Sequence, residues 1–377
     1  MWGSQHACRS HRSKQIGPQI GARIGWAAAR AVAHLFSLSP DYLMTDNRHA
    51  IWLLLIVCAA AWPAQAQQRS AAEDAVESIP LADVRLRDVC ILPDAAMQTY
   101  YMVGPGRNSV RIFTSRDLKT WQGPQTIFRT PEDIWGEIPV VGIWAPEMHK
   151  YRDKYYLFLT FDTRHLLDEQ WPNWRPRVRR SSQILVGDAP TGPFTPFANH
   201  STLPPELMTL DATLWVEDGK PYVVYCHEWV QISNGTIEYL GLTDDLSKTI
   251  GEPQLMFRGS DGPWAQISAT EGCFVTDGPY LRLSKSGKLF MVWSGFGNGG
   301  YTVGLAISDS GKLAGPWRQQ AEPLYQRDGG HAMLFETFDG RVMMVLHSPN
   351  NREARPRIFE LEDTGETLKV VGEFTGE

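Results

Sequence analysis

The chain has few cysteines, and they are far apart. Five occur in 377 residues, and the three that follow residue 66 are Cys90, Cys226 and Cys273. An odd number of widely separated cysteines forms neither a disulfide framework nor a zinc site with short ligand spacing. We therefore expect these three to be buried thiols.

Helical periodicity and a surplus of positive charge are also missing. Between residues 87 and 377, apolar residues do not recur with the sustained 3.6-residue period of a helix. The formal net charge is −6, and residues 1–66 are the more basic part, so the remainder is more acidic still. Such a chain is expected to bind neither nucleic acid nor an anionic membrane.

The hydrophobic run near the N-terminus is too short to span a bilayer comfortably. Residues 50–62 are its apolar core, Arg48 precedes the core, and Ala64-Gln65-Ala66 follows it. This pattern is typical of a cleaved export signal. The sequence predicts an over-called upstream segment at 1–43, a signal peptide at 44–66 and a leader at 67–84. The mature protein is then expected to be periplasmic or extracellular.

The rest of the chain contains a five-fold repeat. Each copy has a leading ionisable residue, an apolar strand, a tight turn and an aromatic strand, and most continue with an alternating strand that ends near Gly-Pro. The copies begin near residues 87, 145, 211, 276 and 329. A strand repeat of this length is typical of a radial array of four-stranded sheets. The fold class is therefore predicted to be all-β, a five-bladed β-propeller in a single domain at 85–377.

The leading residues of the five copies are Asp88, Glu147, Asp211, Asp277 and His331. The first strand of each blade lines the central channel of a propeller, so we expect these side chains to form a ring. Crowded carboxylates cannot all ionise at their usual pKa, so one becomes an acid while another remains a base. Such a pair can cleave a glycosidic bond.

Two insertions are expected to shape the binding face. Residues 165–180 are rich in Trp, Pro and Arg, and residues 257–274 precede the fourth repeat. Trp144, Trp215, Trp229 and Trp293 could stack on sugar rings, although packing between blades is the more common role for each. The arginines within 175–180 are a candidate phosphate clamp, with a solvated loop as the alternative.

Five short motifs together resemble those of glycoside hydrolase family 43 over about residues 85–350. They are Arg87-Asp88, Trp144-Ala145-Pro146-Glu147, Leu210-Asp211, Thr276-Asp277-Gly278-Pro279 and Gly330-His331. The resemblance implies a secreted enzyme that cleaves arabinofuranosyl, xylosyl or related bonds in plant-type polysaccharide with inversion. It makes Asp88 the general base, and it gives Asp211 the role of orienting the acid and tuning its pKa.

The resemblance and the repeat also suggest the contacts to an oligo- or polysaccharide substrate. Residues expected to bind it are Arg87, Trp144, Glu147, Trp229, Trp293 and His331. His331 could in addition help to hold a structural calcium ion through water, as such channel histidines often do in this family. No cofactor is expected to be required, and the sequence does not indicate an oligomeric state.

The general acid is where the chain departs from the family pattern. The family has a Glu at the head of the fourth repeat, whereas the aligned residue here is Asp277, one methylene shorter. Glu271 lies six residues earlier and is the alternative acid. Register favours Asp277, because Pro279 then falls where the family places it, and residue type favours Glu271.

Two other functions stay open at the level of sequence. One is a retaining or phosphorolytic relative with the same five-bladed fold. The other is a propeller that binds carbohydrate without cleaving it, which the non-standard acid keeps in play.

Overall fold

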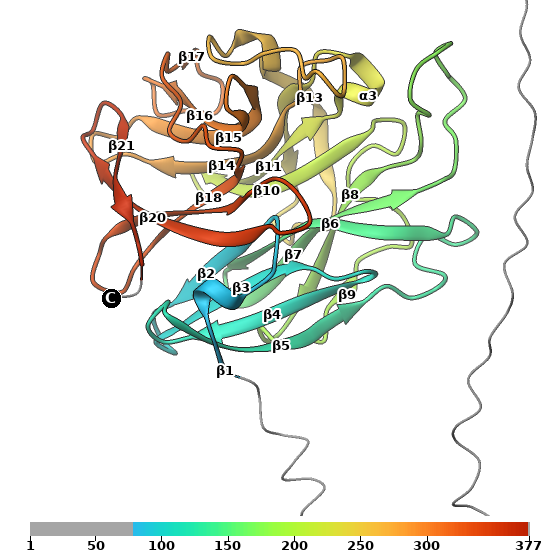
Figure 1. Cartoon of the computed structure of the whole chain (residues 1–377). Helices are drawn as coiled ribbons and strands as arrows, with labels where there is room; N and C mark the ends of the chain where they lie inside the picture. The colour runs from blue at the N-terminus through green and yellow to red at the C-terminus, as the bar shows by residue number, and fades with distance from the viewer. Residues whose placement is uncertain (1–77, 376–377) are drawn as a thin grey trace, which may run out of the picture. The chain divides into compact units, whose positions relative to one another are not determined.

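The computed structural model describes residues 78–375, which form five antiparallel sheets with very little helix. The sheets surround a central axis in chain order, so that the last sheet returns to the side of the first (Figure 1). This confirms the predicted five-bladed β-propeller. Residues 1–43, the signal peptide at 44–66 and residues 67–77 of the leader lie outside the described residues.

Each blade is continuous in sequence, and its first-named strand is the one nearest the axis. Blade 1 contains β2 (Cys90–Asp94), β3 (Thr99–Pro105), β4 (Ser109–Ser115) and β5 (Thr120–Arg129). Blade 2 contains β6 (Val140–Tyr151), β7 (Lys154–Thr163), β8 (Ser181–Gly187) and β9 (Thr195–Pro196). Blade 3 contains β10 (Thr209–Glu217), β11 (Lys220–His227), β12 (Thr236–Leu242) and β13 (Thr249–Arg258).

The last two blades repeat the same order. Blade 4 contains β14 (Asp277–Leu283), β15 (Leu289–Gly297), β16 (Gly300–Ser308) and β17 (Trp317–Gln319). Blade 5 contains β18 (Gly330–Glu336), β19 (Val342–Ser348), β20 (Arg355–Asp363) and β21 (Leu368–Glu373). The one α-helix of the described chain is the short α3 (Trp229–Ile232), and 3-10 turns occur at η2 (Leu81–Asp83) and η3 (Gly259–Asp261).

The first sheet starts earlier than the predicted boundary at residue 85. A short strand, β1 (Ser78–Pro80), pairs with the outer edge of blade 1, where Ile79 is opposite Trp121. Three residues are too few to show the alternation that marks a strand in sequence, and β1 takes its conformation from the edge of β5. Residues 78–84, the described part of the predicted leader, therefore belong to the propeller.

The ring closes between blades 5 and 1 by side-chain packing. Met333 and Phe335 of β18 share one buried apolar cluster with Ile91 and Tyr100 of blade 1. Tyr100 also stacks on Phe338, with ring centroids 4.2 Å apart. Buried aromatic contact of this kind stabilises the closure through the hydrophobic effect, so the two ends need no shared strand.

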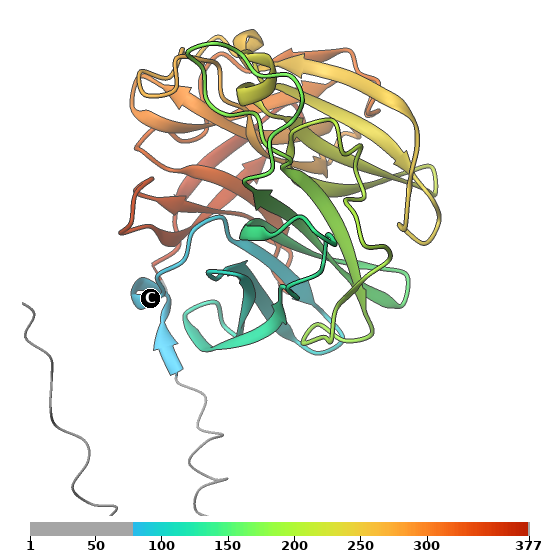
Figure 2. The same ribbon diagram turned by 90° about the vertical axis from the view of Figure 1, so that its right-hand side faces the viewer.

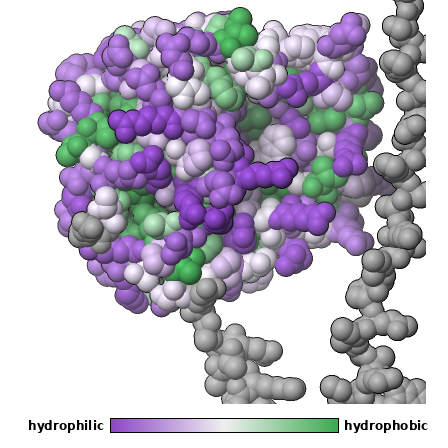
Figure 3. Space-filling model, viewed as in Figure 1, coloured by the Kyte–Doolittle hydropathy of each residue, from purple (hydrophilic) through white to green (hydrophobic). Residues whose placement is uncertain are grey.

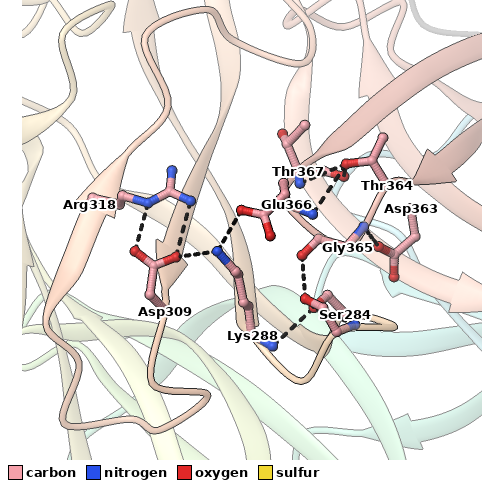
Figure 4. A network of polar contacts seen from close by, with 10 residues as sticks. Ser284, Lys288, Asp309, Arg318, Asp363, Thr364, Gly365, Glu366 and Thr367 are labelled. Atoms are coloured by element: carbon pink, nitrogen blue, oxygen red, sulfur yellow. Dashed lines mark hydrogen bonds and ion pairs between the residues drawn. The ribbon is translucent and has the colours of Figure 1, made fainter.

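Neighbouring blades are also joined at their outer hairpins. Lys288, at the start of β15, lies between Asp309 (2.8 Å) and Glu366 (2.6 Å), and so links blade 4 to blade 5 (Figure 4). Arg318 donates to the same Asp309 (2.9 Å). Exposed ion pairs contribute little individually, about 0–1 kcal/mol each, so this network adds modestly to the packing between blades.

The two insertions meet on one side of the propeller. The loop after β7 runs beside the segment that contains α3 and residues 259–275 (Figure 2). Trp174 of the first insertion donates through its indole N–H to the carbonyl of Val230 in α3 (2.7 Å). The face seen in Figure 3 is mainly hydrophilic, with apolar side chains in small groups. Within residues 78–375 we find no helix with the length and apolarity needed to cross a membrane.

Candidate active site

One backbone feature recurs in or just before every inner strand. A residue there adopts a positive φ, and in blades 2–5 the strand pairing shifts around it, as in a β-bulge. These residues are Asp88 (φ 49°), Ala145 (φ 40°), Asp211 (φ 55°), Gly278 (φ 51°) and His331 (φ 53°). A bulge turns its side chain out of the regular alternation, which explains how this slot points side chains toward one centre.

The shared slot differs from the predicted one in two blades. Asp88, Asp211 and His331 occupy it, as expected, but Asp277 lies one residue before it and Glu147 two residues after it. The reason is that a repeat read from sequence gives the order of strands, whereas the bulge shifts the register within each strand. The expected symmetric ring is thus corrected to three slot residues plus Asp277.

The bulge amide is held by a polar side chain from the preceding blade. Asp211 N–H donates to the Thr160 hydroxyl (3.0 Å), and His331 N–H donates to the Ser294 hydroxyl (2.8 Å). Asp88 N–H donates to Nδ1 of His347 (3.2 Å). All three partners lie on the second strand of the blade before. Their common signal in the sequence is a polar residue at the end of each aromatic strand, and the sequence analysis did not use it.

Gly278 is required where it stands. Its φ is +51°, and a Cβ at this position would lie 3.1 Å from both Cα and Cγ of His331. Its N–H donates to Oδ2 of Asp211 (3.0 Å). A side chain here would therefore push blades 4 and 5 apart and would disturb the hydrogen bond that orients Asp211.

Asp88 is kept ionised. Burial by itself would raise the pKa of its carboxyl, but His331, His347 and Arg87 lower that pKa to well below its usual range. Nδ1 of His331 lies 3.8 Å from Oδ1 of Asp88, and Nε of Arg87 donates to Oδ2 (3.0 Å). Asp88 is thus a carboxylate over the whole range in which proteins work, as a general base must be.

The other two aspartates behave in the opposite way. Burial, with the charge of Asp88 second, raises the pKa of Asp211 well above its usual value. Burial and the charge of Asp211 raise the pKa of Asp277 to about 7, against the lowering effect of His331 and Tyr301. The Tyr301 hydroxyl donates to Oδ2 of Asp277 (2.9 Å). One cavity therefore holds a base and a carboxylic acid whose pKa values are driven apart.

The central cavity has a volume of about 700 Å³ and is lined by residues of all five blades. Among its lining residues are Asp88, Asp211, Asp277, His331, Tyr301, Glu271, Glu228, Trp144, Trp229, Arg87, Arg175 and Arg180. This size suits a small ligand of a few sugar units, and the mixture of polar and aromatic groups suits a carbohydrate.

One wall of the cavity carries an aromatic side chain that is fixed from behind. Trp144 is 36% exposed, and the guanidinium of Arg180 lies 4.1 Å from its ring centroid. Arg180 is held by Asp162 (2.8 Å) and by Glu228. This cation–π contact fixes the indole plane before a ligand arrives.

Glu228 has a free acceptor at the same wall. It is 2% exposed, and its Oε2 atom has no hydrogen-bond partner among the described residues. Burial raises its pKa, while Arg180 opposes that change. A buried oxygen without a partner is costly, so a hydroxyl group of a ligand is its natural partner.

Glu271 also faces the cavity, but it is engaged elsewhere. It forms an ion pair with Arg175, whose guanidinium also donates to the carbonyl of Thr270 (3.2 Å) and lies 5.3 Å from the ring of Trp229. These contacts join the two insertions at the rim. An ion-paired carboxylate cannot give a proton to a leaving group without first breaking that pair.

Two of the predicted contact residues lie outside the cavity lining. Trp293 is fully buried and packs against Trp264, with centroids 4.6 Å apart, so the structure corrects the expectation that it meets a sugar. Glu147 is buried and hydrogen-bonds to His149 (2.8 Å). Both side chains are buried and are not among the residues that line the cavity.

Several residues of the site escaped the sequence analysis. Tyr301 is the second residue of β16, and Glu228 follows β11. Arg180 ends the first insertion and was predicted only as one of the arginines of a candidate phosphate clamp. None of them belongs to an inner strand, so the repeat could not place them near the axis. Their role depends on how the loops and outer strands fold over the channel.

The described residues contain no cluster of charged side chains suited to the predicted calcium ion. Within residues 78–375, no group of three or more His, Cys, Asp or Glu side chains is arranged to hold a metal ion. Nδ1 of His331 lies instead between Asp88 and Asp211, at 3.8 and 3.6 Å. Calcium bound through water stays a prediction, and no step below uses it.

A five-bladed propeller with an acid and a base in its central cavity defines the class as glycosidase-like. The model of the Glycosyl hydrolases family 43 matches residues 78–365. The chain therefore belongs to glycoside hydrolase family 43, as its motifs suggested, and it is a glycoside hydrolase.

Solved structures with the same fold carry related names. The endo-arabinase from Bacteroides thetaiotaomicron VPI-5482 is 36% identical with a TM-score of 0.68, over 75% of this chain and 96% of that one. An α-L-arabinofuranosidase from Lactobacillus brevis is 17% identical with a TM-score of 0.61, over 77% of this chain and 94% of that one. At 17% identity, the likeness to the arabinofuranosidase shows the fold alone.

A curated relative shares part of its length with this protein. Alpha-L-arabinofuranosidase B of Pyricularia oryzae (strain 70-15) is 24% identical over 226 residues, which is 56% of this chain and 44% of that protein. The chain thus spans less than half the length of this relative.

Proposed function

We propose that this glycoside hydrolase cleaves α-L-arabinofuranosyl bonds in plant-type polysaccharide with inversion at the anomeric carbon. The observation that carries the proposal is the pairing, in one cavity, of Asp88 with a strongly lowered pKa and Asp277 with a pKa raised to about 7. The 36% identity to a structure named as an endo-arabinase favours an arabinose substrate over xylose.

The proposed reaction gives each protonation state one role. Asp88 takes a proton from a water molecule while that water's oxygen bonds to the anomeric carbon. The bond from that carbon to the leaving oxygen breaks at the same time, and Asp277 gives its proton to that oxygen. Asp211, buried next to the acid, contributes to the raised pKa of Asp277, and it is itself oriented by the N–H of Gly278.

Asp277 is a better candidate for the acid than Glu271. Its carboxyl is held by the Tyr301 hydroxyl close to Asp211, whereas Glu271 is tied to Arg175 in the rim.

The test is hydrolysis of matched aryl α-L-arabinofuranosides and aryl β-D-xylosides, with arabino-oligosaccharides beside them. We expect the arabinofuranosyl compounds to be preferred, and proton NMR of the first-formed product to show the inverted anomer. Retained configuration would contradict the mechanism. Binding of these sugars without any hydrolysis would instead support the non-catalytic alternative.

Replacement of Trp144 by Ala is expected to raise KM about tenfold with a smaller change in kcat, since a fixed indole platform contributes about 1 kcal/mol of stacking beyond its buried area. Steady-state kinetics on an arabino-oligosaccharide measure this. Trp293→Phe, in the packing between blades, is the matched control and should leave KM unchanged. Equal KM values for wild type and Trp144→Ala would show that the indole does not meet the sugar.

Export is part of the proposal, because a polysaccharide substrate lies outside the cytoplasm. The predicted signal peptide at residues 44–66 supports it. Mass spectrometry of protein recovered from the periplasm or medium should give Gln67 as the first residue. Recovery of the uncleaved chain from the cytoplasm alone would count against export.

A further inference from the structure

A second hollow opens beside the catalytic cavity, between blades 1 and 5. Its volume is about 340 Å³. The charged residues that line it are four arginines, Arg85, Arg87, Arg111 and Arg352. Arg87 and Pro105 line the catalytic cavity as well, so the two spaces share a wall that carries the neighbour of Asp88.

The positive charge of this hollow is only partly balanced. Within residues 78–375, Arg352 makes no hydrogen bond or ion pair, and Nε of Arg111 is buried without a partner. Arg85 pairs with Glu353, but both side chains are more than half exposed. Arg87 is held by Asp88 and by the amide oxygen of Asn350 (3.3 Å). In a chain of net charge −6, such a concentration of guanidinium groups marks a place for an anion.

We propose that this hollow is a subsite for a uronic acid residue of the polysaccharide. The inference rests on the proposed function, because the sugar that is cleaved occupies the catalytic cavity. A neighbouring sugar then reaches past Arg87 into the second hollow. Guanidinium groups bind a carboxylate through paired N–H···O bonds. Arg352 is free to supply them, and Arg85 can do so by exchanging its exposed partner Glu353 for the sugar carboxylate.

The position of the arginines favours a substituent of the substrate over a phosphate nucleophile. A phosphate that attacked the anomeric carbon would have to lie beside Asp88 and Asp277. Arg85, Arg111 and Arg352 line the second hollow and are not among the residues of the catalytic cavity. The subsite therefore selects the polysaccharide and takes no part in bond cleavage.

The test compares two oligosaccharides of the same length and linkage, one with a uronic acid beside the arabinofuranosyl unit and one whose carboxyl group is reduced to an alcohol. Wild type should prefer the acidic compound about tenfold in kcat/KM, and less at high salt. Arg352→Gln should lower that preference about threefold, and the double variant Arg85→Gln/Arg352→Gln should abolish it. Arg318→Gln, on the outside of blade 4, is the matched control.

A neutral aryl arabinofuranoside separates this inference from the proposed function. All variants should hydrolyse it as wild type does, since it does not reach the second hollow. Equal kcat/KM for the acidic and reduced oligosaccharides in wild type would overturn the subsite while leaving the glycosidase intact.

Wild type that hydrolyses none of these compounds would instead overturn the proposed function. In that case, calorimetry with the acidic and the reduced oligosaccharide decides the subsite alone, equal affinity counting against it. Faster turnover with added inorganic phosphate, together with a glycosyl phosphate product, would overturn hydrolysis as the proposed function and would point to the arginines of the catalytic cavity, Arg175 and Arg180.

Discussion

Asp277→Asn is expected to lower kcat by about 10²–10⁴-fold on substrates with a poor leaving group, because the leaving oxygen then departs without a proton. On an aryl glycoside with a strongly acidic phenol the loss should be much smaller, since that phenolate needs no protonation. Kinetics on a series of aryl arabinofuranosides measure this dependence. Glu271→Gln is the matched control and should stay within about tenfold of wild type on every substrate.

The pH profile of wild type gives the same residue a second signature. Asp277 acts when protonated, so kcat/KM should fall as pH rises through about 7, the raised pKa of this carboxyl. Tyr301→Phe removes a hydrogen bond that lowers that pKa, so the alkaline limb should move to higher pH. An unchanged limb in Tyr301→Phe, or full activity in Asp277→Asn, would show that another group is the acid.

Asp277→Asn should lose activity but gain stability. The folded pKa of Asp277 lies above its unfolded value of 3.8, so the folded state binds the proton more tightly, and stability falls as pH rises from about 4 to about 7. Asp277→Asn removes this loss. At pH 8 the variant should be more stable than wild type by up to about 4 kcal/mol, as measured by urea unfolding.

Asp88→Asn is expected to reduce kcat by about 10²–10⁴-fold on every substrate, whatever its leaving group, because water is then no longer deprotonated. Its effect on stability has the other sign. The folded pKa of Asp88 is lowered, so its carboxylate stabilises the fold above its unfolded pKa, and this contribution is lost as pH falls. The variant should therefore be less stable than wild type at pH 7.

Urea unfolding of the two variants side by side provides the check. If Asp88→Asn and Asp277→Asn shift the free energy of unfolding in the same direction at neutral pH, the assigned protonation states are wrong. If Asp88→Asn keeps full activity, the base is another group and the mechanism fails.

Much of the fold was predictable because strands alternate locally. The aromatic second strand recurs in each blade and the Gly-Pro turn or a close variant in most, and this regularity predicts five sheets before any contact is known. The site was partly predictable for the same reason. Asp88, Asp211 and His331 head their repeats in sequence, and their shared backbone conformation places them at one centre.

The remaining parts of the site depend on contacts between distant segments. Trp293 and Glu147 have the same sequence context as channel residues, and burial between blades distinguishes them. Tyr301 and Glu228 reach the cavity from outside the inner strands. No local pattern gives the distance between such groups, because it is set by how blades and loops pack.

The sequence by itself determined the five-bladed architecture, the family and the chemical type of the site, since these follow from periodic strands and from carboxylates that head the repeats. The tertiary structure supports the proposal that Asp277 is the acid. Asp277 and Glu271 are both plausible in sequence, and they differ in what surrounds them. Burial beside Asp211 leaves Asp277 with a proton to give, while Arg175 holds Glu271 in an ion pair at the rim.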